Sequence, residues 1–277
     1  MSVDITIKQT GLFKKKLDLE KIIKDCGLSY GICDENYRLC ENEIGEHTLV
    51  FKRENGLARG IDISLDKNDI HLLLSLPTSK NEIILFYEFT KQLCRMLKTN
   101  RFERNGESCK FDKIEQFIED DIHGSECGLE MIKKNLEENK YNRMEIFGIY
   151  NPISLGLKEM QEIGNDINKF GKYLNDLQAR DVFYAAPRVY NFGGKLVGIY
   201  AVMPDNPSVM PDKPYIVLNQ LEGIEDWYVF FGEGLTVKYE DFINYVDKSD
   251  YYDQNHFVVK LNSQQINLLA EKFSVKL

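Results

Sequence analysis

The chain has 277 residues and a mass of 32.2 kDa, long enough for one large domain or two ordinary ones that fold without disulfides or a structural metal. Hydrophobic residues make up 43% and charged residues 29%, which excludes an intrinsically disordered chain. Asp and Glu outnumber Lys and Arg by 44 to 35, giving a net charge of −9, so no overall positive field would attract nucleic acid or an anionic membrane.

The first residues and the cysteines indicate an intracellular protein. An acid at Asp4 and the lack of a long apolar run argue against a secretory signal. No uncharged apolar stretch approaches the roughly 18 residues that would span a bilayer. All six cysteines precede residue 128, which is not how disulfide frameworks are distributed. We therefore expect cytoplasmic localisation, reduced thiols and no membrane association.

The first half of the chain reads as strands and helices in alternation. Apolar residues alternate over residues 3–7, which predicts a half-buried strand followed by a solvated turn over 11–16. Asp18 caps a short helix that ends near Gly27. A meander of three antiparallel strands is expected over 48–53, 59–65 and 70–76, with turns at 54–56 and 66–69. Ser79 then caps a long amphipathic helix that extends to about residue 98.

The second half repeats the pattern. One or two helices over 112–137 are expected to break at Gly124, and a strand over 144–150 precedes a helix over 154–177 capped by Ser154. Gly193 and Gly194 fit a two-residue hairpin turn between strands. The remaining expectations are strands at 182–192, 195–203, 215–219 and 227–231, a Pro-rich loop at 204–214, a strand that begins at His256, and a Ser263-capped helix over 264–273.

These elements predict an α+β fold in which antiparallel β meanders are covered by amphipathic helices. Two similar-sized lobes are expected, an N-terminal α+β lobe over 1–140 and a C-terminal α+β lobe over 141–277, which either share one sheet or stand apart. Residues 69–79 and 255–263 are both strands led by a His and ended by a Ser cap. An internal duplication explains this similarity, and so does independent use of the same strand-to-helix chemistry.

Metal and cofactor sites are not predicted. Cys26, Cys33 and Cys40 recur every seven residues before His47, but zinc sites favour close cysteine pairs, and the chain contains no Cys-x-x-Cys. His123 and Cys127 have helical spacing with Gly124 between them. Glycines at 193–194 and 232–234 lack the spacing of phosphate-binding loops. Buried structural thiols are the favoured interpretation, with no cofactor.

Catalytic groups are present without a recognisable arrangement. Six cysteines and four histidines permit many nucleophile and base pairs, and none lies in a known local signature. His71 and His256, at the starts of strands, are either catalytic bases or hydrogen-bonded residues of the fold. Paired carboxylates for glycoside hydrolysis cannot be identified from sequence spacing alone.

The segment over 222–253 differs from the rest of the chain. It carries nine acids against two lysines, interleaved with nine aromatic residues. Such a composition suits a protein interface in which rings supply contact area and carboxylates attract a basic partner. The alternative is that the rings face the core and the acids face water. The candidate partner-binding residues are Trp227, Tyr228, Glu240, Asp241, Tyr245, Asp247, Tyr251 and Tyr252.

Two functions from different classes follow. The favoured hypothesis is a non-enzymatic protein-binding module whose partner is a basic protein, for example a toxin neutralised in the manner of an immunity protein. The alternative is a small-molecule enzyme with a site between the two lobes, drawing on His71, His256 or nearby acids. The oligomeric state is not predicted.

Three segments carry a resemblance to a known family. They are the opening strand, the turn Gly11-Leu12-Phe13-Lys14-Lys15-Lys16 and the strand Gly60-Ile61-Asp62-Ile63-Ser64-Leu65. Together they resemble an uncharacterised bacterial family of about this length, a domain of unknown function, and the resemblance covers the whole chain. It implies no activity, cofactor or catalytic residue.

Overall fold

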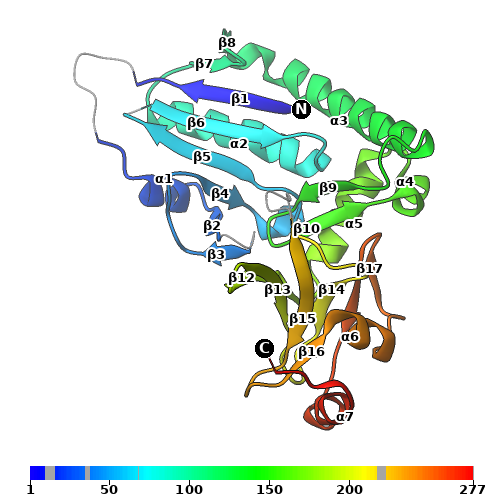
Figure 1. The fold of residues 1–277 in the computed structure, drawn as a ribbon. Helices are drawn as coiled ribbons and strands as arrows, with labels where there is room; N and C mark the ends of the chain where they lie inside the picture. The colour runs from blue at the N-terminus through cyan, green and yellow to red at the C-terminus, as the bar shows by residue number, and fades with distance from the viewer. Residues whose placement is uncertain (10–15, 35–37, 68, 217–222, 277) are drawn as a thin grey trace. The chain divides into compact units, whose positions relative to one another are not determined.

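The computed structural model describes residues 1–9, 16–34, 38–67, 69–216 and 223–276 (Figure 1). Helices and strands occur in comparable amounts, and most strand pairs are antiparallel, so the predicted α+β class is confirmed. Residues 1–179 form a first compact unit and residues 180–277 a second, smaller one. Each sheet formed by the described strands lies within one unit.

An eight-stranded antiparallel sheet forms the centre of the first unit. Its strands are β1 (Ser2–Ile7), β2 (Ser29–Cys33), β3 (Leu39–Glu41), β4 (Thr48–Phe51), β5 (Ile61–Asp66), β6 (Asp69–Ser75), β7 (Arg101–Arg104) and β8 (Glu107–Lys110). Their order across the sheet is β3-β2-β4-β5-β6-β1-β7-β8. The predicted meander of β4, β5 and β6 is confirmed, and β1 pairs with both β6 and β7. Of the turn predicted over 11–16, residues 11–15 lie outside the described residues. Asn68, in the turn over 66–69, lies outside them as well.

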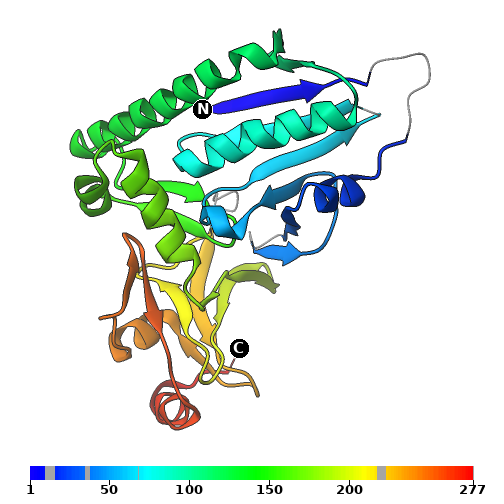
Figure 2. The same cartoon turned by 180° about the vertical axis from the view of Figure 1, so that it is seen from behind.

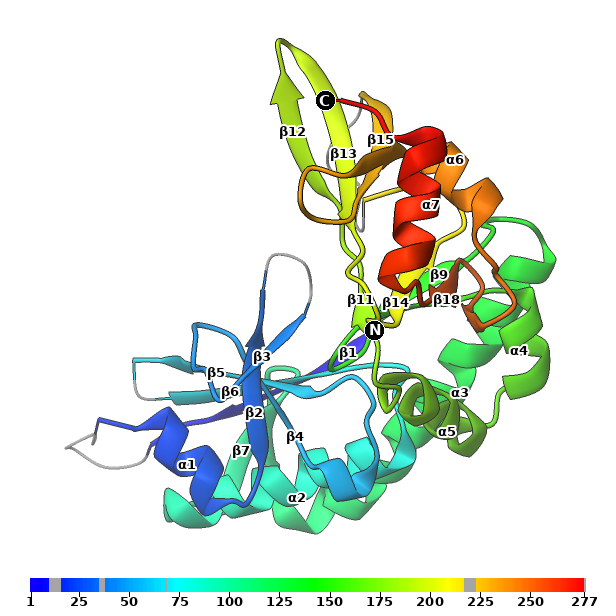
Figure 3. The ribbon, with the colours of Figure 1, turned by 90° about the horizontal axis from the view of Figure 1, so that it is seen from below.

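Three helices cover one face of this sheet: α1 (Leu19–Asp25), α2 (Lys80–Met96) and α3 (Ile114–Glu137). Figures 2 and 3 show them on the same side. Their apolar stripes pack on the inward residues of β1, β5 and β6 to form one core. Asp18 and Ser79 accept hydrogen bonds from Lys21 N and Glu82 N as the predicted caps of α1 and α2. The outward side chains of β1, β5 and β6, such as Thr6, Asp62 and Leu73, lie on the opposite face of the sheet, here called the open face.

The helix α3 does not break at Gly124, contrary to the expectation. Short 3-10 turns, η1 (Arg53–Asn55) and η2 (Phe111–Lys113), occur before β5 and α3, and α3 then continues through Gly124 to Glu137. A Cβ at Gly124 would lie 3.7 Å from the sulfur of Met1 and 3.9 Å from a methyl of Leu76. Packing on the sheet offsets the roughly 1 kcal/mol that a glycine costs in a helix.

A hairpin and two helices complete the first unit: β9 (Met144–Phe147), β10 (Pro152–Leu155), α4 (Leu157–Ile163) and α5 (Ile167–Gln178). The strand near 144–150 is confirmed, but the single helix predicted over 154–177 is wrong. Ser154 lies in β10, and Gly164, at φ +64°, ends α4 before Asp166 caps α5. Because α4 and α5 pack on α3, residues 141–179 belong with the first unit, not with a lobe over 141–277.

Two four-stranded sheets form the second unit. Its strands are β11 (Phe183–Tyr184), β12 (Arg188–Phe192), β13 (Lys195–Ala201), β14 (Ser208–Pro211), β15 (Ile224–Phe230), β16 (Thr236–Lys238), β17 (Tyr251–Asp253) and β18 (His256–Val259). The sheets have the orders β11-β14-β18-β17 and β12-β13-β15-β16. The helices are α6 (Tyr239–Tyr245) and α7 (Ser263–Phe273).

The turn chemistry of the second unit was partly predicted. Gly193 and Gly194 have φ of +63° and +96° and join β12 to β13, which confirms the hairpin. The Pro-rich segment contains the strand β14, which pairs with β18 and, in parallel, with β11. Asn262 caps α7 in place of Ser263. Of the strand expected over 215–219, residues 217–219 lie outside the described residues.

The similar segments 69–79 and 255–263 occupy different places in their sheets. The strand β6 lies between β5 and β1, whereas β18 lies between β14 and β17. Both lead to a capped helix, so the shared feature is local strand-to-helix chemistry. The different sheet orders give a duplication no support.

Two features are absent from the described residues. None of the helices in that part of the chain is both long and apolar enough to cross a membrane. No group of three or more His, Cys, Asp or Glu side chains suited to a metal ion occurs there either.

Candidate functional site

The acidic aromatic segment does not form the single surface expected of it. Four of its rings, Phe231, Tyr239, Phe242 and Tyr252, are buried, three of them in the core of the second unit. Strand alternation in β15 places Trp227 against that core and Tyr228 on the other face. The burial of these rings agrees with the alternative interpretation of the segment, in which the rings face the core.

Several of the segment's acids are already paired within the second unit. Lys195 binds Asp226 at 2.8 Å and Arg180 binds Asp250 at 2.8 Å. Asp253 is buried and bound to His256, and Glu222 lies outside the described residues. Of the candidate partner-binding residues, Tyr252 is removed from the surface, and Trp227 and Tyr228 are half-buried. Four candidates lie in or just after α6: Glu240, Asp241, Tyr245 and Asp247. Tyr251 is exposed but lies apart from them in the chain, in β17.

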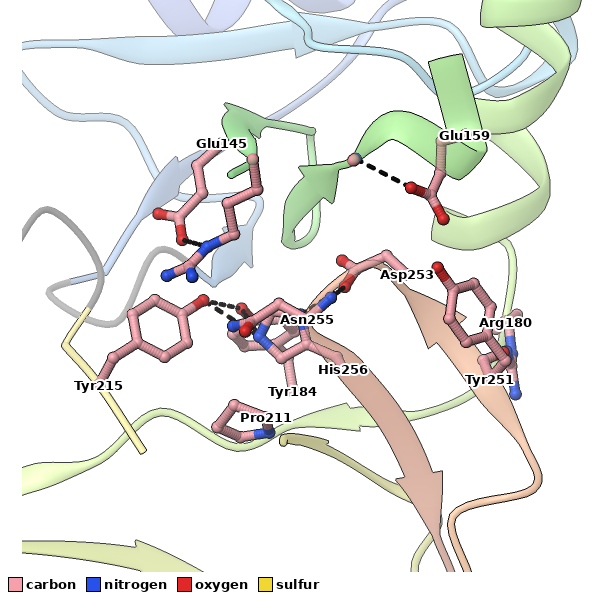
Figure 4. A network of polar contacts seen from close by, with 12 residues as sticks. Glu145, Glu159, Arg180, Tyr184, Pro211, Tyr215, Tyr251, Asp253, Asn255 and His256 are labelled. Atoms are coloured by element: carbon pink, nitrogen blue, oxygen red, sulfur yellow. Dashed lines mark hydrogen bonds and ion pairs between the residues drawn. The ribbon is translucent and has the colours of Figure 1, made fainter. Parts of the chain in front are cut away.

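His256 is the centre of a buried polar network (Figure 4). Its Nδ1 lies 2.7 Å from Asp253 Oδ1, and its Nε2 lies 3.0 Å from the hydroxyls of both Tyr184 and Tyr215. The imidazole and the carboxylate are 4% and 1% exposed. A carboxylate, an imidazole and a phenol in series can relay a proton. Their burial within paired strands gives them a structural role, linking β17, β18 and β11.

His71 has an equally local partner. Its Nδ1 lies 3.0 Å from the Thr6 hydroxyl across the β1–β6 pair. Both side chains are on the open face of the eight-stranded sheet. Hydrogen bonds within the fold, one of the two interpretations given for His71 and His256, account for the positions of both side chains.

A cavity of about 320 Å³ opens on this same face, wholly within the first unit. We name it the Arg59 cavity. Its lining comes from the outward positions of β2, β4, β5 and β6, from the residues before β5, and from the end of β9. The lining residues are Cys33, His47, Leu49, Arg59, Gly60, Asp62, Leu73, Ser75, Phe147 and Gly148.

The backbone at Arg59 and Gly60 is held by a buried carboxylate. Glu82, in the first turn of α2, accepts hydrogen bonds from the backbone N–H of Arg59 at 3.1 Å, from that of Gly60 at 2.7 Å, and from the Thr78 hydroxyl. Gly60 has φ +79°, which a side chain would disfavour. Burial raises the pKa of Glu82, and the hydrogen bonds it accepts oppose that rise.

The Arg59 guanidinium lines the cavity without a carboxylate of its own. Its Nε donates to Phe147 O at 3.2 Å and its Nη1 to Pro77 O at 3.4 Å. Among the described residues no ion pair involves Arg59, although Glu82 lies close behind it. Burial lowers the pKa of the guanidinium, because the charged form is less stable away from water.

A thiol, an imidazole and a carboxylate also line the cavity. His47 Nδ1 lies 3.2 Å from Asp62 Oδ1. Cys33 ends β2 and His47 directly precedes β4. Because Gly31 of β2 pairs with Leu49 of β4, both residues lie at the same end of this strand pair, where both line the cavity. Partial burial and the charge of Asp34 raise the pKa of the Cys33 thiol.

A second thiol–imidazole pair lies on α3. The Cys127 sulfur is 3.5 Å from His123 Nε2, because the helix continues through Gly124 and aligns positions four residues apart. Both side chains are exposed, and neither lines the Arg59 cavity. Cys127 and His123 are therefore a control for Cys33 and His47, because they are the same residue types outside the cavity.

Sequence reasoning missed Arg59 and Glu82. Arg59 was assigned only to the start of a strand, and Glu82 is three residues after the Ser79 cap, where a glutamate ordinarily bonds back to the cap. The usable signal was Arg59-Gly60 before a strand, a charged residue next to a backbone that needs positive φ. Nothing local in the sequence links it to Glu82.

Comparison with known protein families gives a match over nearly the whole chain. The model of the family described as "Domain of unknown function (DUF4299)" matches residues 2–269. No curated protein matches the chain. No solved structure matches it either.

Proposed function

We propose that this chain, which belongs to the DUF4299 family of domains of unknown function, binds a small anionic molecule in the Arg59 cavity. The observation that carries the proposal is the Arg59 guanidinium, which lines the cavity, is partly buried and has no ion-pair partner among the described residues. A charge removed from water needs a counter-charge nearby. Glu82 supplies part of it from the core side, and a bound anion would supply the rest from the cavity side.

The chemistry of the lining fits a ligand with a carboxylate or phosphate and a short apolar body. Guanidinium is the side chain best suited to planar, charge-assisted hydrogen bonds with such groups. Leu49, Leu73 and Phe147 offer apolar contact, and Ser75 offers a hydroxyl. The volume is near the lower end of the roughly 300–1,000 Å³ of ligand pockets. A ligand of metabolite size is therefore expected.

Protection of Cys33 from alkylation tests this proposal. We expect succinate or inorganic phosphate to slow iodoacetamide labelling of Cys33 by about fivefold or more when the site is saturated, because the ligand covers the cavity lining. Labelling of Cys127, followed in the same sample by peptide mass spectrometry, should not change. Comparing the two anions distinguishes a carboxylate site from a phosphate site.

Variants of two arginines complete that experiment. Arg59→Met should abolish protection, whereas Arg53→Met should preserve it, because Arg53 is paired with Glu41 and does not line the cavity. Circular dichroism of each variant checks the fold, since Arg59 also binds two backbone carbonyls. Equal protection in both variants, or no protection of the native chain by either anion, would contradict the proposal.

A second proposal is the binding of a basic protein at α6. It is favoured by Glu240, Asp241, Tyr245 and Asp247, which lie in or directly after one short helix and are all at least partly exposed. Within the described part of the chain, Glu240 and Asp241 form no ion pair. This surface is smaller than the one expected from the sequence, because Tyr252 is not part of it.

Charge reversal tests the second proposal. Asp241→Lys combined with Asp247→Lys should abolish capture of a basic partner at low salt, and native capture should weaken as salt rises. Glu271→Lys, on the exposed side of α7, is the control and should leave capture unchanged. A partner retained by the double variant would exclude α6 as its binding surface.

A further inference from the structure

We propose that Cys33 is a nucleophile for acyl transfer, with His47 as its base and Asp62 as the group that orients His47. The inference rests on the proposed function, because it assigns the anion-binding cavity a substrate class. That class is a small ester or thioester that also carries a carboxylate or phosphate. Cys33, His47, Asp62 and Arg59 all line the one cavity.

The geometry at His47 is that of an oriented base. The Nδ1 of His47 lies 3.2 Å from Asp62 Oδ1. A carboxylate at this position favours the tautomer that carries the proton on Nδ1, which leaves the lone pair on Nε2. Nε2 has no hydrogen-bond partner in the described part of the chain, and neither does the Cys33 thiol. The imidazole is 69% exposed, so it can rotate about its side-chain bonds toward the thiol. Catalytic hydrogen bonds commonly shorten only when substrate is bound.

The environment of the thiol determines how it must be activated. Burial, Asp34, Cys40 and Asp62 all raise the pKa of Cys33, so the resting side chain is the neutral thiol. A nucleophile held as the thiol needs a base at the moment of attack, as a serine does. His47 is the imidazole that lines the same cavity.

The reaction balances with water as the only other reagent. His47 Nε2 takes the proton of Cys33 while Sγ forms a bond to the acyl carbon. The bond from that carbon to the leaving oxygen or sulfur then breaks, and the leaving group takes the proton from His47. Water, deprotonated by the same imidazole, cleaves the resulting thioester and restores the thiol. Arg59 would hold the carboxylate or phosphate of the substrate and so fix which end reaches Cys33.

The probe for this chemistry is mono-4-nitrophenyl succinate, an activated ester with a free carboxylate. We expect a burst of about one nitrophenolate per chain and a succinyl group on Cys33 in peptide mass spectra, as for covalent catalysis. Cys33→Ser should abolish the burst, and His47→Gln should slow it by about a hundredfold. Cys127→Ser and His123→Gln are the matched controls and should leave it unchanged. A burst that persists in Cys33→Ser, or succinylation of Cys127 in place of Cys33, would overturn the inference.

The neutral ester 4-nitrophenyl acetate separates the two proposals. If succinate protects Cys33 from iodoacetamide but neither ester acylates it, anion binding stands and catalysis is overturned. If both esters acylate Cys33 equally and Arg59→Met changes nothing, catalysis stands and anion binding is overturned. Both proposals are supported if the succinate ester acylates Cys33 about tenfold faster than the acetate ester does, and if Arg59→Met makes the two rates equal.

Discussion

Replacing Asp121 with Ala is expected to lower the free energy of unfolding of the first unit by about 3–5 kcal/mol. Asp121 is buried and accepts hydrogen bonds from Arg104 Nη2 and the Tyr87 hydroxyl, both at 2.5 Å. Arg104 also lies over the Phe117 ring. Removal of the carboxylate leaves a half-buried guanidinium without its counter-charge. Urea denaturation of the full chain, followed by circular dichroism, measures the loss.

Its neighbour provides the control. Asp120 is exposed, and among the described residues it accepts a hydrogen bond only from Gln116 on the same helix, so Asp120→Ala should change stability by less than about 0.5 kcal/mol. Burial raises the pKa of Asp121, whereas the hydrogen bonds from Tyr87 and Arg104 and the charge of Arg104 favour the ionised carboxylate. An amide in its place keeps one acceptor oxygen but loses the counter-charge. Asp121→Asn, which keeps the shape, should therefore lie between the native chain and Asp121→Ala. Equal stability of Asp121→Ala and Asp120→Ala would contradict this account.

Replacing Tyr252 with Ala is expected to destabilise the second unit by about 3–5 kcal/mol, as for other buried aromatic residues. The residue is 2% exposed, its ring lies edge-on to His256, and the Arg180 guanidinium is 5.5 Å from the ring centre. The truncation leaves a cavity beside the buried network of His256. The fluorescence of Trp227, which also belongs to the second unit, reports its unfolding transition.

The adjacent tyrosine is a matched comparison. Tyr251 is 42% exposed, and Tyr251→Ala should cost less than about 1 kcal/mol. From the sequence, Tyr251 and Tyr252 were both predicted to bind a partner. If Tyr251→Ala is the more destabilising change, the separation into buried and exposed rings is wrong.

Local periodicity was enough to predict much of the first unit. Alternation in β1, the caps at Asp18 and Ser79, and the stripe on α2 each depend on residues close in sequence, and each is confirmed. Errors arose where tertiary packing overrides local preference. Gly124 remains helical because α3 packs on the sheet, and residues 152–155 form β10 because they pair with β9.

The candidate site was the least predictable part. The cavity gathers Cys33, His47, Arg59, Ser75 and Phe147 from separate segments, and only the sheet register brings them to one face. The carboxylate that fixes Arg59 comes from α2, more than twenty residues away. In contrast, the acidic aromatic segment attracted attention by composition alone, and composition does not reveal which side of a strand or helix each ring occupies.

The position of β1 has a consequence for synthesis on the ribosome. In the sheet, β1 lies between β6 and β7, two strands made much later. β1 has no neighbour until β6, which ends at Ser75, has left the exit tunnel, and it lacks β7 until about Arg104 has emerged, so the two parts of the sheet join only then. Nascent chains of this protein therefore expose unpaired strand edges for most of the time needed to translate the first unit, when a chaperone that shields them would matter most.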